Sequence, residues 1–133
     1  FKIFNLEGVV IEELNYTQGK KDDECKYFYD DGKPLKIEHW TVGVKNGDFK
    51  MFYYDGFVQT TENYKKGLKE GAFEEFYPDG KLKHNRIFKK DELLEEYKYD
   101  QHGRETYAFP VRVKEDEEDD EAPTMDGKKK KNK

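Results

Sequence analysis

FYPDGKLKHNRIFKK, residues 76–90, has a pattern that returns along the chain. An aromatic pair precedes an Asp-Gly dipeptide, and a strand-like run that ends in an aromatic residue and two lysines follows it. Glycines recur every 24 residues, with Phe four positions before each and another aromatic eight positions after each. The columns are Gly8, Gly32, Gly56 and Gly80; Phe4, Phe28, Phe52 and Phe76; and Tyr16, Trp40, Tyr64 and Phe88. Columns in one register indicate an internal repeat.

One further column and one irregularity define the repeat units. The column is Phe1, Cys25, Phe49, Phe73 and Tyr97, and it predicts that Cys25 is a small buried side chain. Gly103 follows Gly80 after 23 residues, one fewer than the regular spacing. The units therefore lie near residues 1–24, 25–48, 49–72 and 73–96, with a partial unit at 97–113. Together they form one repeat domain, residues 1–113.

Each unit is predicted to be a β-hairpin. The Asp-Gly dipeptides before Gly32, Gly56 and Gly80 favour tight turns, because glycine adopts positive φ at little cost. Glycines four apart, as in TVGVKNGD and KKGLKEGA, indicate a second turn that returns the chain. Residues 91–100 suit a strand better than a helical turn. The expected fold is all-β: an elongated, single-layer antiparallel sheet of tandem 24-residue hairpins, in which equivalent aromatics of neighbouring units stack.

Composition agrees with a thin sheet. Charged residues make up 41% of the chain and aromatics 16%, and disordered chains are poor in aromatics. One cysteine forms no internal disulfide, and no apolar run is long enough for a membrane span.

GVKNGDFKMFYYDG (43–56) and GLKEGAFEEFYPDGKLKHNRIFKK (67–90) resemble the MORN-type repeat in its bacterial variant form. The resemblance implies an elongated sheet of stacked hairpins that acts as an interaction platform. It also implies protein contacts, with lipid contacts proposed for some members and an antitoxin label on some bacterial relatives. The chain departs from the pattern at Asp22-Asp23, where Gly47 and Gly71 have no counterpart, and at Asp91 and Glu95, which leaves the turn geometry of the first and fourth units open.

The periodicity stops at Lys114. Residues 115–121, EDEEDDE, are all acidic, and KKKKNK closes the chain at residues 128–133. Like-charge blocks repel themselves, so residues 114–133 are interpreted as a charged tail. The tail either solubilises the protein or binds a basic surface, and its lysines could contact acidic lipid, nucleic acid or the acidic block itself.

The sequence predicts no catalytic residue, no cofactor and no metal site. His39, His84 and His102 fall in three different columns, and no Cys/His pair has the spacing of zinc ligands. A catalytic thiol at Cys25 would require a nearby base. Adjacent carboxylates on a strand point to opposite faces and cannot act as one acid/base pair.

The leading functional hypothesis is a non-catalytic protein-interaction module or scaffold subunit. Tyr29, Tyr53 and Tyr77 form a column beside the hairpin turns and are the candidate partner-binding residues; alternatively, they shield the backbone of a thin sheet. The rival hypotheses are an antitoxin-like inhibitor and an accessory subunit of a bacterial cell-envelope assembly, with cytoplasm and periplasm both open.

Net charge and open sheet edges bear on three other kinds of partner: nucleic acid, a membrane and a second copy of the chain. A net charge of −5 argues against nucleic acid, and membrane contact has little support. Open sheet edges would allow oligomers by strand pairing.

Overall fold

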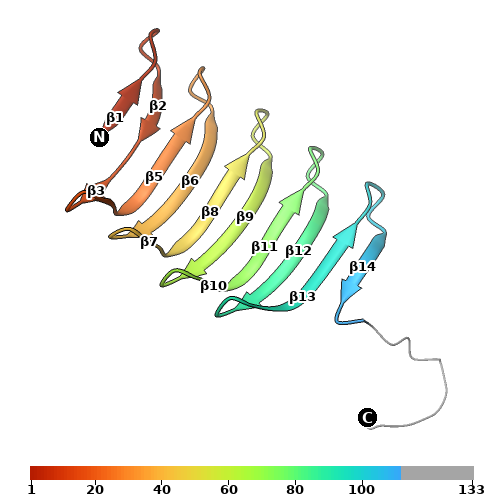
Figure 1. Ribbon diagram of the computed structural model, residues 1–133. Coiled ribbons are helices and arrows are strands. Elements are labelled where there is room, and N and C mark those ends of the chain that lie inside the picture. Colours follow the sequence, from red (N-terminus) through yellow and green to blue (C-terminus); the bar gives the residue numbers. More distant parts are fainter. Residues whose placement is uncertain (112–133) are drawn as a thin grey trace, which may run out of the picture.

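The structure, a computed structural model, describes residues 1–111 and contains strands and turns with no helix in that range. Most of the strands form one open antiparallel sheet that runs from β1 at one edge to β14 at the other (Figure 1). Consecutive hairpins lie side by side in chain order, which confirms the expected all-β sheet of tandem hairpins. The predicted tail, residues 114–133, lies outside the described residues. The strands are β1 (Lys2–Phe4), β2 (Val10–Glu13), β3 (Tyr16–Thr17), β4 (Lys20–Lys21), β5 (Asp23–Phe28), β6 (Pro34–Thr41), β7 (Val44–Lys45), β8 (Gly47–Phe52), β9 (Val58–Lys65), β10 (Leu68–Lys69), β11 (Gly71–Phe76), β12 (Leu82–Lys89), β13 (Glu92–Tyr99) and β14 (Glu105–Phe109).

The hairpin turns that contain the repeating glycine lie together at one end of the strands: residues 5–9, 29–33, 53–57, 77–81 and 100–104. We call this side of the sheet the Asp-Gly edge, after the dipeptide found in three of these turns. In the second unit, the N–H of Gly32 donates to the carbonyl of Tyr29 at 2.8 Å, and the N–H of Tyr29 donates to the carbonyl of Lys33 at 2.8 Å. Gly32 has φ of +92°, so the loop is a three-residue turn that ends in a left-handed glycine. The other four turns repeat both bonds.

The opposite long edge holds two-residue turns centred on residues 18–19, 42–43, 66–67 and 90–91, and we call it the lysine edge. Both central residues have positive φ, as at Lys66 (+51°) and Gly67 (+84°), which is the geometry of a type I′ turn. Asp91 takes the glycine position at φ of +71° and keeps the turn, because a short polar side chain tolerates this region. Asp23, at φ of +68°, likewise replaces the glycine found at position 47. The two-residue turns of the first and fourth units thus keep the geometry of the others, whereas Glu95, at the position equivalent to Gly71, lies inside β13 without a positive φ.

Side chains of the core lie on one face of the sheet. Residues directly opposite across a ladder share a face, and the pairs Cys25↔Glu38, Phe49↔Glu62 and Phe73↔Arg86 place these six on the same one. We call it the aromatic face. The buried residues, Leu14, Cys25, Glu38, Phe49, Phe73 and Phe88, all lie on it, and Cys25 is fully enclosed as predicted.

The last unit departs from the register. In β13, Glu96 pairs with Arg86 and Tyr97 pairs with Asn85, whereas Phe73 pairs with Arg86 in the preceding hairpin. One missing residue moves every later side chain to the other face. The prediction that Tyr97 continues the Phe49 and Phe73 column is therefore wrong, and Glu96 occupies that place.

Candidate binding surfaces

A file of five aromatic rings runs along the aromatic face: Trp40, Phe49, Tyr64, Phe73 and Phe88. Successive centroids lie 5.4, 5.2, 5.3 and 4.9 Å apart, and each pair meets edge to face. Such pairs contribute about 0.5–1.5 kcal/mol beyond the area they bury. Two of the sequence columns alternate in the file. Equivalent residues of neighbouring units lie two strands apart, about 10 Å, too far for ring contact, so the expectation that identical residues stack is corrected.

Lysines cover this file from the short strands at the lysine edge. Lys45 lies opposite Trp40 on β7, and its Nζ is 5.1 Å from the ring centre of Phe49 and 4.7 Å from that of Tyr64. Lys69 on β10 approaches Phe73 and Phe88 at 5.6 and 4.9 Å. Each contact is worth about 0.5–1 kcal/mol at a solvated site. The lysine stems therefore replace the missing second layer of the fold.

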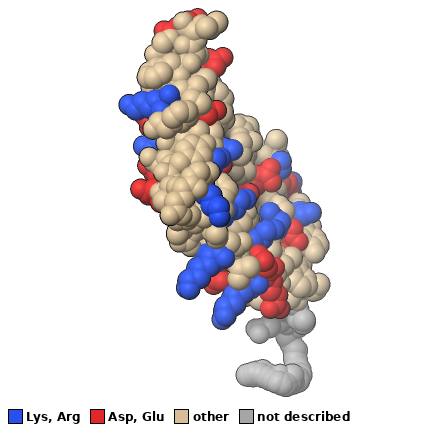
Figure 2. All heavy atoms as spheres, turned by 60° about the vertical axis from the view of Figure 1, so that its left-hand side comes forward, with Lys and Arg blue, Asp and Glu red and all other residues tan. Residues whose placement is uncertain are grey.

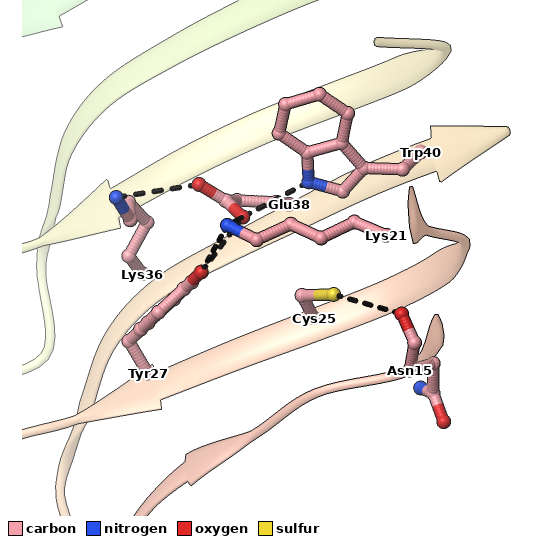
Figure 3. A network of polar contacts seen from close by, with 7 residues as sticks. All are labelled: Asn15, Lys21, Cys25, Tyr27, Lys36, Glu38 and Trp40. Atoms are coloured by element: carbon pink, nitrogen blue, oxygen red, sulfur yellow. Dashed lines mark hydrogen bonds and ion pairs between the residues drawn. The ribbon is translucent and has the colours of Figure 1, made fainter. Parts of the chain in front are cut away.

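Glu38 lies at the start of the file with 6% of its surface exposed (Figure 3). Its Oε1 accepts hydrogen bonds from the indole N–H of Trp40 at 2.9 Å and from the hydroxyl of Tyr27 at 3.1 Å. Lys21 Nζ is 3.4 Å from the same oxygen, and Lys36 Nζ is 3.3 Å from Oε2. The carboxylate is thus enclosed by four donors.

The electrostatics of this cluster hold each group in its neutral-pH form. Burial works against the charge of Glu38, but the Trp40 hydrogen bond and the two lysines outweigh it and lower the pKa of Glu38. The hydrogen bond to Tyr27 is the main cause that raises the pKa of Lys21 to about 12, and burial raises the pKa of Tyr27. These shifts suit a structural charge cluster and not proton transfer near pH 7.

A second polar group forms around His84 near the C-terminal end of the same face. His84 Nε2 is 2.6 Å from Glu96 Oε2, and Nδ1 is 3.9 Å from Glu75 Oε1. His84 also lines a surface hollow of about 340 Å³ with Tyr77 and Lys98. The sequence did not predict this group, because Glu96 reaches His84 only through the register change in β13.

The other histidine of a strand lies elsewhere. His39 pairs with Glu24 on the opposite face, and its Nδ1 is 2.8 Å from the carbonyl oxygen of Asp48. The two strand histidines therefore do not meet. Within residues 1–111, no group of His, Cys, Asp and Glu is arranged to hold a metal ion, and no helix could cross a membrane.

The tyrosines predicted to contact a partner join neighbouring units. The hydroxyls of Tyr29, Tyr53 and Tyr77 each donate to a backbone carbonyl of the following unit, at 2.7–2.8 Å. These bonds hold successive Asp-Gly turns together. Partner contact through the same residues stays a prediction.

Two exposed aromatic residues accompany the tyrosines at the Asp-Gly edge. Tyr54 and Phe57 are 52% and 51% exposed, although both belong to the third unit at the centre of the sheet. Tyr54 packs edge to face on Tyr29 with centroids 5.2 Å apart, and its hydroxyl donates to the carboxylate of Asp31. Lys33 Nζ lies 4.2 Å from the Tyr54 ring centre. Tyr54 is thus held in place, and both rings face solvent. The sequence did not point to Tyr54 and Phe57 as a surface, because neither position belongs to an aromatic column.

The chain matches no protein-family model, no curated protein and no solved structure. The resemblance to MORN-type repeats therefore stays a prediction from the residues that carry it.

Proposed function

We propose that this chain is a non-catalytic protein-interaction module that contacts its partner through the Asp-Gly edge. The observation that carries the proposal is the exposure of Tyr54 and Phe57, each about half accessible in the turn of the central unit. Aromatic side chains dominate the energetics of protein interfaces, and large exposed ones gather where partners bind.

The neighbouring residues support this choice of edge. Tyr29 and Lys33 fix the orientation of the Tyr54 ring, so a partner would meet a surface whose side chains are already ordered. Ordered contact residues bind more tightly, because less conformational freedom is lost on association. Tyr29, Tyr53 and Tyr77 support the edge from beneath by their bonds between units.

The test is affinity capture from a lysate of the source organism, followed by titration calorimetry with the purified partner. Three forms of the full chain are compared: wild type, the double variant Tyr54→Ser/Phe57→Ser, and the control Val42→Ser/Val44→Ser. The control removes two exposed apolar residues from the lysine edge. Circular dichroism establishes that all three retain the sheet.

We expect wild type and control to capture the same partner with equal affinity. The Asp-Gly edge variant should bind it about a hundredfold more weakly, since two interface aromatics contribute together about 3 kcal/mol. A partner held equally by all three forms, or lost only by the lysine-edge control, would show that the Asp-Gly edge is not the contact surface.

A further inference from the structure

The lysine edge carries four exposed lysines at its two C-terminal turns. Lys65 ends β9 and Lys66 begins the turn to β10; Lys89 ends β12 and Lys90 begins the turn to β13. All four are exposed. Among residues 1–111, the ion pairs of the structure include none of these four. Figure 2, which brings this side of the molecule forward, shows Lys and Arg side chains projecting toward the C-terminal end of the described chain.

Two carboxylates of these turns accept backbone N–H groups. Glu70 Oε1 accepts the N–H of Lys90 at 3.0 Å, and Asp91 Oδ1 accepts the N–H of Lys69 at 2.7 Å. Glu92 is exposed and lies across the turn from Lys89. These carboxylates keep their charge, so Asp91 and Glu92 balance Lys89 and Lys90, and the excess of positive charge lies at the β9–β10 turn, where Lys65, Lys66 and Lys69 outnumber Glu70. The sheet holds the two turns about 10 Å apart.

The described chain ends beside this row. Strand β14 runs antiparallel to β13, with Phe109 opposite Glu96, and β13 begins directly after the turn at Lys90 and Asp91. The chain therefore approaches the lysine edge as it passes from Phe109 to Val111, and in Figure 1 the arrow of β14 points to the end of the sheet where the β12–β13 turn lies.

The sequence that follows has complementary charge. Residues 115–121, EDEEDDE, begin four positions after Val111. An extended chain covers about 3.3 Å per residue, so these residues can reach points between about 13 and 33 Å from Val111. The two lysine turns lie roughly 7 and 17 Å from β14 across the sheet, counted at about 4.8 Å per strand. Seven carboxylates thus fall within reach of four exposed lysines.

We propose that the acidic block, residues 115–121, binds the lysine edge of its own chain at Lys65, Lys66, Lys89 and Lys90. The tether gives the block an effective concentration in the millimolar range, which favours this occupant over a separate acidic molecule. An acidic partner of the lysine edge would then have to displace the block. This inference does not depend on the Asp-Gly edge as the site of partner binding.

Zero-length carbodiimide cross-linking of the full chain tests the contact, because the reagent joins a carboxylate to an amine only where the two touch. Peptide mass spectrometry reads which lysines couple to residues 115–121. Lys33 and Lys81, on the Asp-Gly edge, are the internal controls. We expect coupling to the four edge lysines to exceed coupling to the controls by about tenfold, and to fall at high salt, where screening shortens to about 3 Å.

Mixed ¹⁵N- and ¹⁴N-labelled protein separates contact within a chain from contact between chains. Coupling confined to Lys128–Lys131, coupling equal at both edges, or cross-links that join the two isotopes would each overturn the proposal. The first outcome would assign the block to the lysines of its own tail, and the last would assign it to a second copy.

A probe experiment gives an independent readout. The peptide EDEEDDE, carrying a fluorophore, is titrated with wild type and with a full chain in which residues 115–121 are all changed to Gln or Asn. We expect the neutralised chain to bind the peptide about tenfold more tightly than wild type, because its lysine edge is vacant. Adding Lys65→Gln, Lys66→Gln, Lys89→Gln and Lys90→Gln should abolish that gain. Equal binding by wild type and the neutralised chain would refute occupancy of the edge by the block.

Discussion

Changing Glu38 to Gln removes a negative charge from the most enclosed polar side chain of the sheet and keeps its shape. The amide oxygen still accepts from Trp40 and Tyr27, whose donors lie 2.9 and 3.1 Å from Oε1. What is lost is the attraction to Lys21 and Lys36, whose nitrogens lie 3.4 and 3.3 Å from the carboxylate. The variant therefore isolates the electrostatic part of the cluster.

The two lysine side chains are 31% and 36% exposed, so solvent screens each ion pair. A partly exposed pair contributes up to about 1 kcal/mol, and Glu38→Gln should lower the free energy of unfolding by about 1–2 kcal/mol. Glu38→Ala also leaves the Trp40 N–H and the Tyr27 hydroxyl without their acceptor, which adds about 1–2 kcal/mol. We expect about 3 kcal/mol for the alanine variant.

Urea denaturation followed by tryptophan fluorescence measures both changes, since Trp40 is the one tryptophan and lies in the cluster. The pH dependence has a definite sign. The folded-state pKa of Glu38 is lowered below its ordinary value of 4.5, so its contribution is fully present above that pH. It disappears as the pH falls through the folded pKa, so the gap between wild type and Glu38→Gln should narrow progressively once the pH falls below 4.5.

Glu62→Gln is the matched control, because Glu62 holds the equivalent position one unit later. Tyr64 donates to its Oε1 at 3.0 Å, and no lysine forms an ion pair with it among the described residues. We expect its cost to stay below about 0.5 kcal/mol. Equal costs for the two glutamine variants, or a Glu38 gap that does not shrink as the pH falls below 4.5, would refute the electrostatic account.

Three further predictions concern the contacts between units. Phe73→Ala should lower the free energy of unfolding by about 3–4 kcal/mol in urea denaturation, because Phe73 is 4% exposed and touches two rings of the file; a cost under 1 kcal/mol would mean that the file does not support the sheet. Tyr53→Phe should cost about 1 kcal/mol by the same assay, since it deletes the hydroxyl that donates to the carbonyl of Phe76; an unchanged midpoint would remove this bond from the account. Burial and the hydrogen bond to Glu62 raise the pKa of Tyr64 to about 12, so Tyr64→Phe should remove ultraviolet absorbance that titrates near pH 12; loss of absorbance that titrates near pH 10 would contradict this.

Much of the fold could be predicted because the same turn and strand residues recur in every unit. Glycine at positions 32, 56 and 80 adopts the positive φ that the turn requires. The aromatic columns show which residues of each strand share a face. Cys25 was assigned to the core by its column alone. The 24-residue period therefore predicts hairpins, edges and faces together.

The parts that could not be predicted depend on single residues. The shortened spacing before Gly103 indicates a deletion, but the sequence does not say on which side of Tyr97 the residue is missing. Position 91 needs a left-handed residue, and aspartate satisfies it as glycine does. The Glu38 cluster escaped notice because Lys21 reaches Glu38 from β4 in the preceding unit, and no spacing rule brings that lysine to β6, although Lys36 lies two residues before Glu38 on the same strand and face.

Every surface assigned above depends on which face of the sheet each side chain occupies. The most direct test is an NMR measurement of nuclear Overhauser effects from aromatic ring protons to other rings and to methyl groups in the full chain. The account predicts cross-peaks along the file from Trp40 to Phe88, none from Tyr97 to Phe73 or Phe88, and contact of Tyr97 with Ala108 on the opposite face. Cross-peaks that join the Tyr97 ring to the file would contradict the register and the surfaces derived from it.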